Sequence, residues 1–122
     1  EVHALMCKDS LDMTEDDRST IFKAIGVYAR HGHPIMVLHG TDTMEHTARY
    51  CYTQQALPLV PIIFTGAMKP MGFEDSDAKQ NVVESLYAAK IVDPGWYISF
   101  HSTLFKVPNV KKNKARRTFK RT

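Results

Sequence analysis

The sequence predicts a three-layer α/β/α fold built on a doubly wound, mostly parallel β-sheet. Short apolar runs alternate along the chain with segments of helical periodicity, which is typical of parallel strands joined by helices. Polar turns follow several of the apolar runs, and open α/β sheets bind their ligands at the carboxyl ends of such strands. A length of 122 residues with 43% hydrophobic residues fits one domain, residues 1–122, whose crossovers we expect to be right-handed.

The first half of the chain contains two expected strands and two expected helices. The apolar run at residues 2–6 is the first strand. A helix begins after Thr14, which forms a capping box with Asp17, and its apolar face consists of Ile21, Phe22, Ile25 and Tyr28. The second strand covers residues 34–39, and a helix follows from residue 43 to about residue 55.

The second half of the chain continues the alternation. The third strand covers residues 59–65, and a helix runs from residue 76 to about residue 92, where Asp93-Pro94-Gly95 ends it. We expect the inward face of this helix to consist of Val82, Val83, Leu86 and Ala89. The last strand covers residues 96–100, with an extension through Leu104 as an alternative.

Charge is distributed unevenly along the chain. Seven of the 16 Lys and Arg residues lie in the last twelve positions, which leaves the rest of the chain with a net charge of −4. We interpret residues 113–122 as a solvated basic tail, because no aromatic stacking pattern accompanies the charges. Contact with nucleic acid or another polyanion is the alternative interpretation.

The remaining composition points away from metal sites and membranes. Cys7 and Cys51 lack the spacing of zinc or redox sites, so we expect buried free thiols and, with them, a cytoplasmic protein. The histidines other than His39 show no ligand spacing, and we therefore expect no metal site. The longest apolar stretch is far shorter than a membrane span, so no membrane partner is expected.

The run His39-Gly40-Thr41-Asp42-Thr43 stands between an expected strand and an expected helix. It places a hydroxyl and a carboxylate at the carboxyl end of a strand. Asp42 has two interpretations: it is an N-cap, with Glu45 three positions later, or it belongs to a functional site. We expect His39 to buttress the turn.

Three other segments are equally distinctive as sequence motifs. They are Lys8-Asp9-Ser10-Leu11-Asp12-Met13-Thr14, Phe64-Thr65-Gly66-Ala67-Met68-Lys69-Pro70 and Val110-Lys111-Lys112-Asn113. Together with the His-Gly-Thr-Asp-Thr run, and with Ser76-Asp77-Ala78 at the start of a helix, they resemble the bacterial L-asparaginase family. The sequence looks most similar to the short, single-domain members. This resemblance implies the fold of the asparaginase N-terminal domain.

The resemblance also implies a cofactor-free amidohydrolase that converts L-asparagine to L-aspartate and ammonia through a threonine acyl-enzyme. It assigns catalysis to Thr41, Asp42 and Lys112. Asp9 and Ser10 hold the amino acid end of the substrate, and the backbone at Gly40 and Ala67 supplies oxyanion donors. L-Glutamine and the D-isomers are alternative substrates, and the active form is expected to be a homo-oligomer.

The family pattern begins with a strand and a Thr-Gly-Gly-Thr-Ile turn, whose leading threonine is the usual nucleophile. The sequence lacks this run, so we expect that a piece of roughly 30 to 45 residues is omitted, or that the protein lacks this nucleophile. Two alternative functions follow. One is a catalytically deficient module that binds amino acids or regulates, and the other is the ammonia-supplying component of a tRNA-dependent amidotransferase, whose basic tail would meet RNA.

Overall fold

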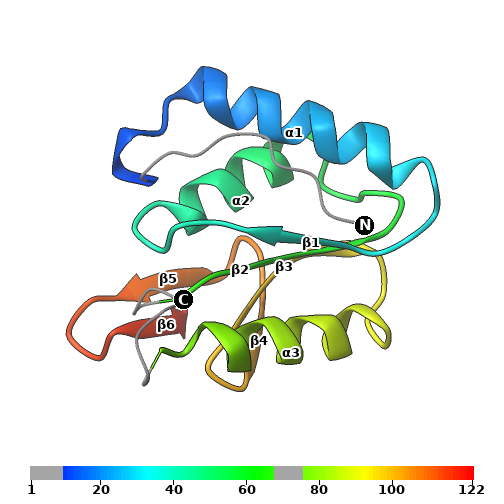
Figure 1. Cartoon of the computed structure of the whole chain (residues 1–122). Coiled ribbons are helices and arrows are strands. Elements are labelled where there is room, and N and C mark those ends of the chain that lie inside the picture. Colours follow the sequence, from blue (N-terminus) through cyan, green and yellow to red (C-terminus); the bar gives the residue numbers. More distant parts are fainter. Residues whose placement is uncertain (1–9, 68–75) are drawn as a thin grey trace.

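A computed structural model describes residues 10–67 and 76–122 and confirms an α/β fold (Figure 1). The helices are the short 3-10 turn η1 (Ser10–Asp12), α1 (Glu15–Ala29), α2 (Met44–Gln54) and α3 (Ala78–Ala89). The strands are β1 (Ile35–Leu38), β2 (Pro61–Thr65), β3 (Gly95–Phe100), β4 (Thr103–Lys106), β5 (Val110–Asn113) and β6 (Thr118–Arg121). The strand expected at residues 2–6 lies outside the described residues.

The main sheet is mostly parallel, as predicted. Its four strands follow the order β1-β2-β3-β4, in which β1, β2 and β3 run parallel and β4 pairs with β3 in the antiparallel direction. Leu38 at the end of β1 is in register with Thr65 at the end of β2. The turns that follow these two strands therefore start side by side at the carboxyl ends of the parallel strands.

Helices cover both faces of the sheet. Helices α1 and α2 lie on one face, and α3 lies on the other (Figure 1). Since β1, β2 and β3 follow one another in one direction, the crossovers through α2 and α3 have opposite hands. The expectation of right-handed crossovers is therefore wrong for one of the two. Two right-handed crossovers would place both helices on one face, whereas every residue of β2 is buried and the strand needs a cover on each side.

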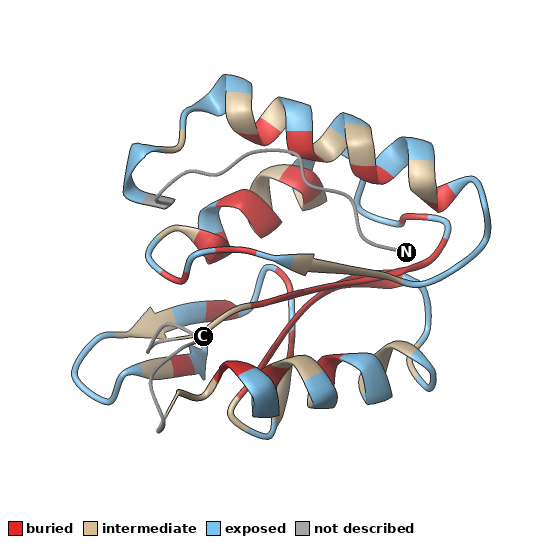
Figure 2. Cartoon of the chain, in the orientation of Figure 1, coloured by how far each residue is buried: buried red, intermediate tan, exposed pale blue. Residues whose placement is uncertain are grey.

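The apolar core lies between the sheet and the layer of α1 and α2. It contains Ile21, Ile25, Met44, Ala48, Cys51, Ile62, Phe64, Trp96, Ile98 and Phe100 among its buried residues. Figure 2 shows the buried positions of these two helices on the sides that face the sheet. The predicted capping box begins α1, because the Thr14 hydroxyl accepts from the Asp17 N–H and the Asp17 carboxylate accepts from the Thr14 N–H.

Helix α3 packs differently from the prediction. It buries Ala78, Asn81 and Ser85, whereas Val83 and Leu86 are 58% and 50% exposed. The inward face expected from apolar periodicity is thus wrong at these two positions. Small and polar side chains let α3 lie close to the sheet and bond to the backbone, as Asn81 Nδ2 does to the Gly66 carbonyl at 2.9 Å.

The carboxyl-terminal residues also differ from the prediction. Strand β3 ends at Phe100, and the chain reverses at His101 and Ser102, which have φ angles of 45° and 64°, into β4 rather than extending β3. Strands β5 and β6 then pair as an antiparallel hairpin. The expected solvated tail is folded because Phe119 is buried, with its ring 5.0 Å from that of Phe100.

Two other expectations concern cysteines and membranes. Cys51 is a buried free thiol, as predicted, and burial raises its pKa to about 12. Cys7 lies outside the described residues. Of the helices that the structure describes, none has both the length and the apolar character needed to span a bilayer.

Candidate active site

Three predicted residues meet at the carboxyl end of β1. Lys112 Nζ on β5 lies 3.0 Å from Thr41 Oγ1 and 2.7 Å from Asp42 Oδ1. Thr41 is buried, the Lys112 side chain is 11% exposed and the Asp42 side chain is 43% exposed. The amine therefore reaches a largely enclosed hydroxyl, while the carboxylate is partly exposed to solvent.

Asp42 does not cap the helix that follows. The N-cap of α2 is Thr43, and the first helical residue is Met44. The carboxylate of Asp42 instead accepts a hydrogen bond from Lys112, so the capping interpretation of Asp42 is wrong. The functional interpretation of Asp42 stays a prediction.

A carboxylate and a guanidinium on α2 hold the strand that carries Lys112. Glu45 Oε2 accepts from the Lys112 N–H at 3.3 Å and from Arg49 Nη2 at 3.1 Å. Arg49 Nη2 also donates to the Val110 carbonyl at 2.6 Å. Glu45 is 6% exposed, so this charge pair is shielded from water on one side. The two contacts fix β5 on both sides of Lys111 and thereby place Lys112.

Sequence reasoning missed this pair. Glu45 and Arg49 stand four positions apart, a spacing at which opposite charges meet on one side of a helix. That spacing predicts the ion pair between them. It does not reveal the strand that they bind, because Lys112 lies 67 residues beyond Glu45.

His39 buttresses the turn, as expected. Burial is the main cause that lowers the pKa of His39 below its ordinary value, so its imidazole is neutral. Nδ1 lies 2.6 Å from the Gly40 carbonyl and must donate to it, which leaves Nε2 to accept from the Thr47 hydroxyl at 2.9 Å. Arg18 Nε in turn donates to Thr47 Oγ1 at 3.2 Å. A continuous chain of bonds thus links α1, α2 and the turn.

The ends of β1 and β2 touch at a glycine. A Cβ at Gly66 would lie 2.2 Å from the His39 carbonyl oxygen, a distance that excludes any side chain there. This contact brings Gly40 and Ala67 to one hollow of about 300 Å³. Its lining consists of Leu38, His39, Gly40, Gly66, Ala67, Ala78 and Val82. The two predicted oxyanion positions therefore share a pocket, while their role stays a prediction.

A second group of polar side chains holds the wall of this hollow on the α3 side. Asn81 is fully buried and donates to the Gly66 carbonyl, while its Oδ1 accepts from the His101 N–H at 3.0 Å. His101 Nε2 lies 2.6 Å from Asp77 Oδ2, and His101 Nδ1 lies 2.8 Å from Thr118 Oγ1. These bonds tie the start of α3 to the ends of β2 and β3 and to β6. No sequence motif had singled out Asn81 or His101.

The predicted substrate-binding pair is only partly covered by the structure. Ser10 begins η1, and Asp9 lies outside the described residues. Their roles stay predictions. Within residues 10–67 and 76–122, no three His, Cys, Asp or Glu side chains gather closely enough to hold a metal ion.

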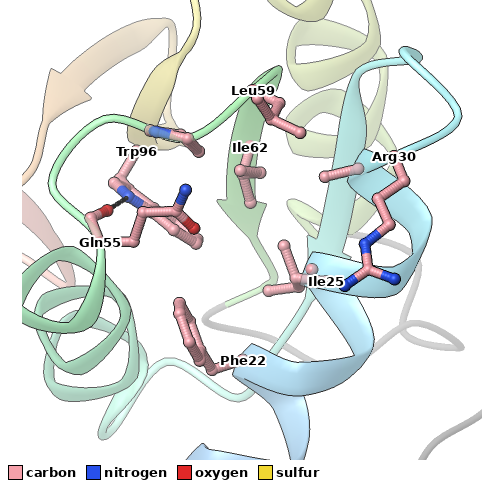
Figure 3. A pocket seen from close by; sticks show the side chains of 10 residues that line it. Phe22, Ile25, Arg30, Gln55, Leu59, Ile62 and Trp96 are labelled. Atoms are coloured by element: carbon pink, nitrogen blue, oxygen red, sulfur yellow. Dashed lines mark hydrogen bonds between the residues drawn. The ribbon is translucent and has the colours of Figure 1, made fainter.

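A separate pocket lies near the amino ends of the strands (Figure 3). It has a volume of about 200 Å³, and its lining includes Phe22, Arg30, Leu59 and Trp96. The Trp96 indole N–H donates to the Gln55 carbonyl at 2.6 Å, as the dashed line in Figure 3 indicates. No residue of the candidate active site lines this pocket.

Comparisons with known proteins point to one family. A family model described as "Asparaginase, N-terminal" matches residues 1–121. The L-asparaginase of Thermococcus kodakarensis is 29% identical over 112 residues, which cover 92% of this chain and 34% of that protein. The solved structure of this thermostable enzyme matches with a TM-score of 0.93 at 27% identity, over 99% of this chain and 38% of that chain.

Two further relatives are a second L-asparaginase and a component of an amidotransferase. The L-asparaginase of Dirofilaria immitis is 37% identical over 101 residues, or 80% of this chain and 17% of that protein. A glutamyl-tRNA(Gln) amidotransferase subunit of Methanobrevibacter smithii is 41% identical over 56 residues, or 46% of this chain and 13% of that protein. The chain thus spans about a third or less of the length of these curated relatives.

Proposed function

The chain belongs to the family of the asparaginase N-terminal domain, and from this membership we propose that it is an amidohydrolase that converts L-asparagine to L-aspartate and ammonia. One observation carries the proposal: a single amine, Lys112 Nζ, bonds to both the Thr41 hydroxyl and the Asp42 carboxylate. Acyl transfer needs a hydroxyl within reach of a base, and the 3.0 Å contact meets that requirement.

The proposed reaction proceeds through an ester of Thr41. Thr41 Oγ1 attacks the amide carbon of the substrate, and its proton passes to the neutral form of the Lys112 amine. Backbone N–H groups at Gly40 and Ala67 stabilise the oxyanion. The C–N bond then breaks, and the leaving nitrogen takes the proton and departs as ammonia. Water hydrolyses the ester, which releases L-aspartate and restores the threonine.

The remaining polar groups bind the ends of the amino acid. Asp42 is the most exposed member of the group, and its carboxylate faces the opening where the substrate's α-ammonium would arrive. Ser10 hydrogen-bonds the α-carboxylate, and the turn of Asp9 and Ser10 holds the amino acid end of the substrate. L-Glutamine and the D-isomers are alternative substrates of the same site. We further propose that the active form is a homo-oligomer in the cytoplasm.

A second candidate function has one specific observation in its favour. The similarity to the glutamyl-tRNA(Gln) amidotransferase of Methanobrevibacter smithii reaches 41% identity over 56 residues. In that case the same amide hydrolysis would supply ammonia to a partner protein. An amino acid binding module without catalysis is the third possibility, and the following experiment separates it from the two enzymes.

The experiment measures ammonia release from L-asparagine by this chain and by the protein expressed from its natural start codon. Lys112→Met should lower the rate at least about 100-fold, because it removes the proposed base. Lys111→Met is the matched control, since Lys111 is the exposed neighbour on the same strand, and it should leave the rate unchanged. Thr41→Ala should be as slow as Lys112→Met.

Two results would contradict the proposal. Equal activity of Lys112→Met and the unsubstituted protein would show that Lys112 takes no part in the reaction. If neither form releases ammonia and asparagine raises the melting temperature, the result would support an amino acid binding module instead of an enzyme.

A further inference from the structure

Positive charge is concentrated at the carboxyl end of the chain. Residues 94–122 contain eight Lys and Arg residues and no Asp or Glu, although the chain holds 13 acidic residues in all. The last part of this segment is the β5–β6 hairpin, whose turn is exposed and extends to one side of the molecule (Figures 1 and 2). The charges therefore sit on a folded element rather than on a loose tail.

The hairpin separates its side chains into two faces. Val110, Lys112 and Phe119 are buried or half-buried, and Lys112 reaches back to the candidate active site. Lys111 and Lys120 alternate with these residues and are exposed, so they point to the opposite side of the hairpin. With the exposed turn, this side forms what we term the basic hairpin face: Lys111, Lys114, Arg116, Arg117 and Lys120.

The basic hairpin face places like charges next to one another. Lys111 and Lys120 are direct cross-strand partners, an arrangement in which like charges destabilise a hairpin. Across the part of the chain that the structure describes, the ion pairs involve none of its five cations. Arg121 differs, because it donates to the Leu104 carbonyl and lies 5.5 Å from the centre of the Phe105 ring. A bound polyanion would relieve the repulsion.

We propose that the basic hairpin face binds the phosphate backbone of a nucleic-acid duplex. Several cations on a short, folded element suit a regular array of phosphates, because each contact releases a condensed counterion. The aromatic rings of residues 103–122, Phe105 and Phe119, are buried. Among residues 103–122 no exposed ring is thus available to stack on unpaired bases, which favours a duplex over a single strand.

The test measures binding of the whole chain to a 20-base-pair DNA duplex at several salt concentrations. The affinity should fall with salt along a log–log slope of about −3 to −5, which corresponds to three to five phosphate contacts. Lys111→Gln/Lys120→Gln should weaken binding about tenfold at low salt and should make the slope shallower by about 2. A duplex of the same length in RNA should bind with a comparable slope, because the contacts do not read bases.

The matched control removes the same charge elsewhere. Lys23 on α1 and Lys90 after α3 are exposed, so Lys23→Gln/Lys90→Gln has the same net charge as the hairpin variant. It should change the affinity less than about twofold. Lys114→Gln/Arg116→Gln in the hairpin turn provides a second test that leaves both strands unaltered.

Three results would overturn the proposal. If the hairpin and control variants weaken duplex binding equally, the effect depends on net charge alone. Tighter binding of a 20-nucleotide oligothymidine than of the duplex would point to a single strand. Tighter binding of phosphatidylserine vesicles would assign the face to a membrane. None of these measurements depends on amide hydrolysis, so the outcome is independent of the proposed function.

Discussion

The two helical layers hold the sheet by different means. On the side of α1 and α2, large apolar side chains form one continuous core, with Phe64, Trp96 and Phe100 almost fully buried. On the side of α3, the buried helix residues are Ala78, Asn81 and Ser85, while Val83 and Leu86 remain largely in water. Apolar burial therefore anchors one layer, and hydrogen bonds anchor the other.

The difference matters for the site that lies between the layers. Thr41 and Asp42 lie in the turn before α2, Glu45 lies in the first turn of α2, and α2 packs on the apolar core. The α3 layer contributes a wall of the adjacent hollow, and it is held by directional bonds from Asn81. The apolar layer thus supports the turn that carries Thr41 and Asp42, and the hydrogen-bonded layer holds a wall of the hollow in place.

The largest expected effect comes from two neighbouring isoleucines of β2. Ile62 and Ile63 are both fully buried, but Ile62 belongs to the apolar core and Ile63 does not. Ile62→Ala should cost about 4 kcal/mol in the free energy of unfolding and Ile63→Ala about 2 kcal/mol, because Ile62 packs within the cluster of large apolar side chains. Urea denaturation measures both values. Equal losses in the free energy of unfolding would show that the two helical layers do not differ in apolar packing.

Removal of a hydrogen-bonding side chain should have a smaller effect. Asn81→Ala deletes bonds to the Gly66 carbonyl and to the His101 N–H, and should cost about 2 kcal/mol. Gln80→Ala, one position away on the exposed side of α3, serves as the control and should stay within about 0.5 kcal/mol. If the two variants unfold at the same urea concentration, the bonds of Asn81 do not anchor the layer.

The polar chain through His39 should make stability depend on pH. Its pKa is lowered in the folded state, so below about pH 6.5 the unfolded state binds the proton more readily. The free energy of unfolding should fall as the pH drops below that value, and it should be level above it. His39→Gln should flatten this part of the profile, measured by urea denaturation between pH 5 and pH 8. An unchanged profile would show that other groups cause the dependence.

The smallest effect is expected on the exposed side of α3. Leu86 is 50% exposed, so Leu86→Gln should change the free energy of unfolding by less than about 0.5 kcal/mol. Leu86 belongs to the face that apolar periodicity had predicted to be buried. A cost above about 2 kcal/mol would restore that prediction and would make the two layers alike.

Predictions from local sequence patterns were the most reliable ones. The capping box of Thr14 and Asp17 was predictable because its two partners stand three positions apart. The strand end at Thr65 followed from a short apolar run, whereas the end predicted at His39 lies one residue beyond Leu38, the observed end of β1. The inward face of α3 was not predictable, since its packing depends on the Gly66 carbonyl rather than on hydrophobicity.

Contacts between distant residues needed other information. Lys112 and Thr41 are 71 residues apart, and only the family resemblance brought them together. Each hairpin strand has four residues and one buried apolar residue, Val110 in β5 and Phe119 in β6. The basic residues beside them hide the alternation of buried and exposed positions, so the sequence did not predict these strands. The Glu45 and Arg49 contacts to β5 became visible only once that strand was in place.

The contact at Gly66 also bears on how this sequence can vary. Position 26 has open space around its missing Cβ, so mutation can introduce alanine there without a steric penalty. At position 66 the first added carbon meets backbone, which no rotamer change can relieve. In a library of all single substitutions selected for folding, position 66 should therefore retain glycine alone, while position 26 should accept many residues.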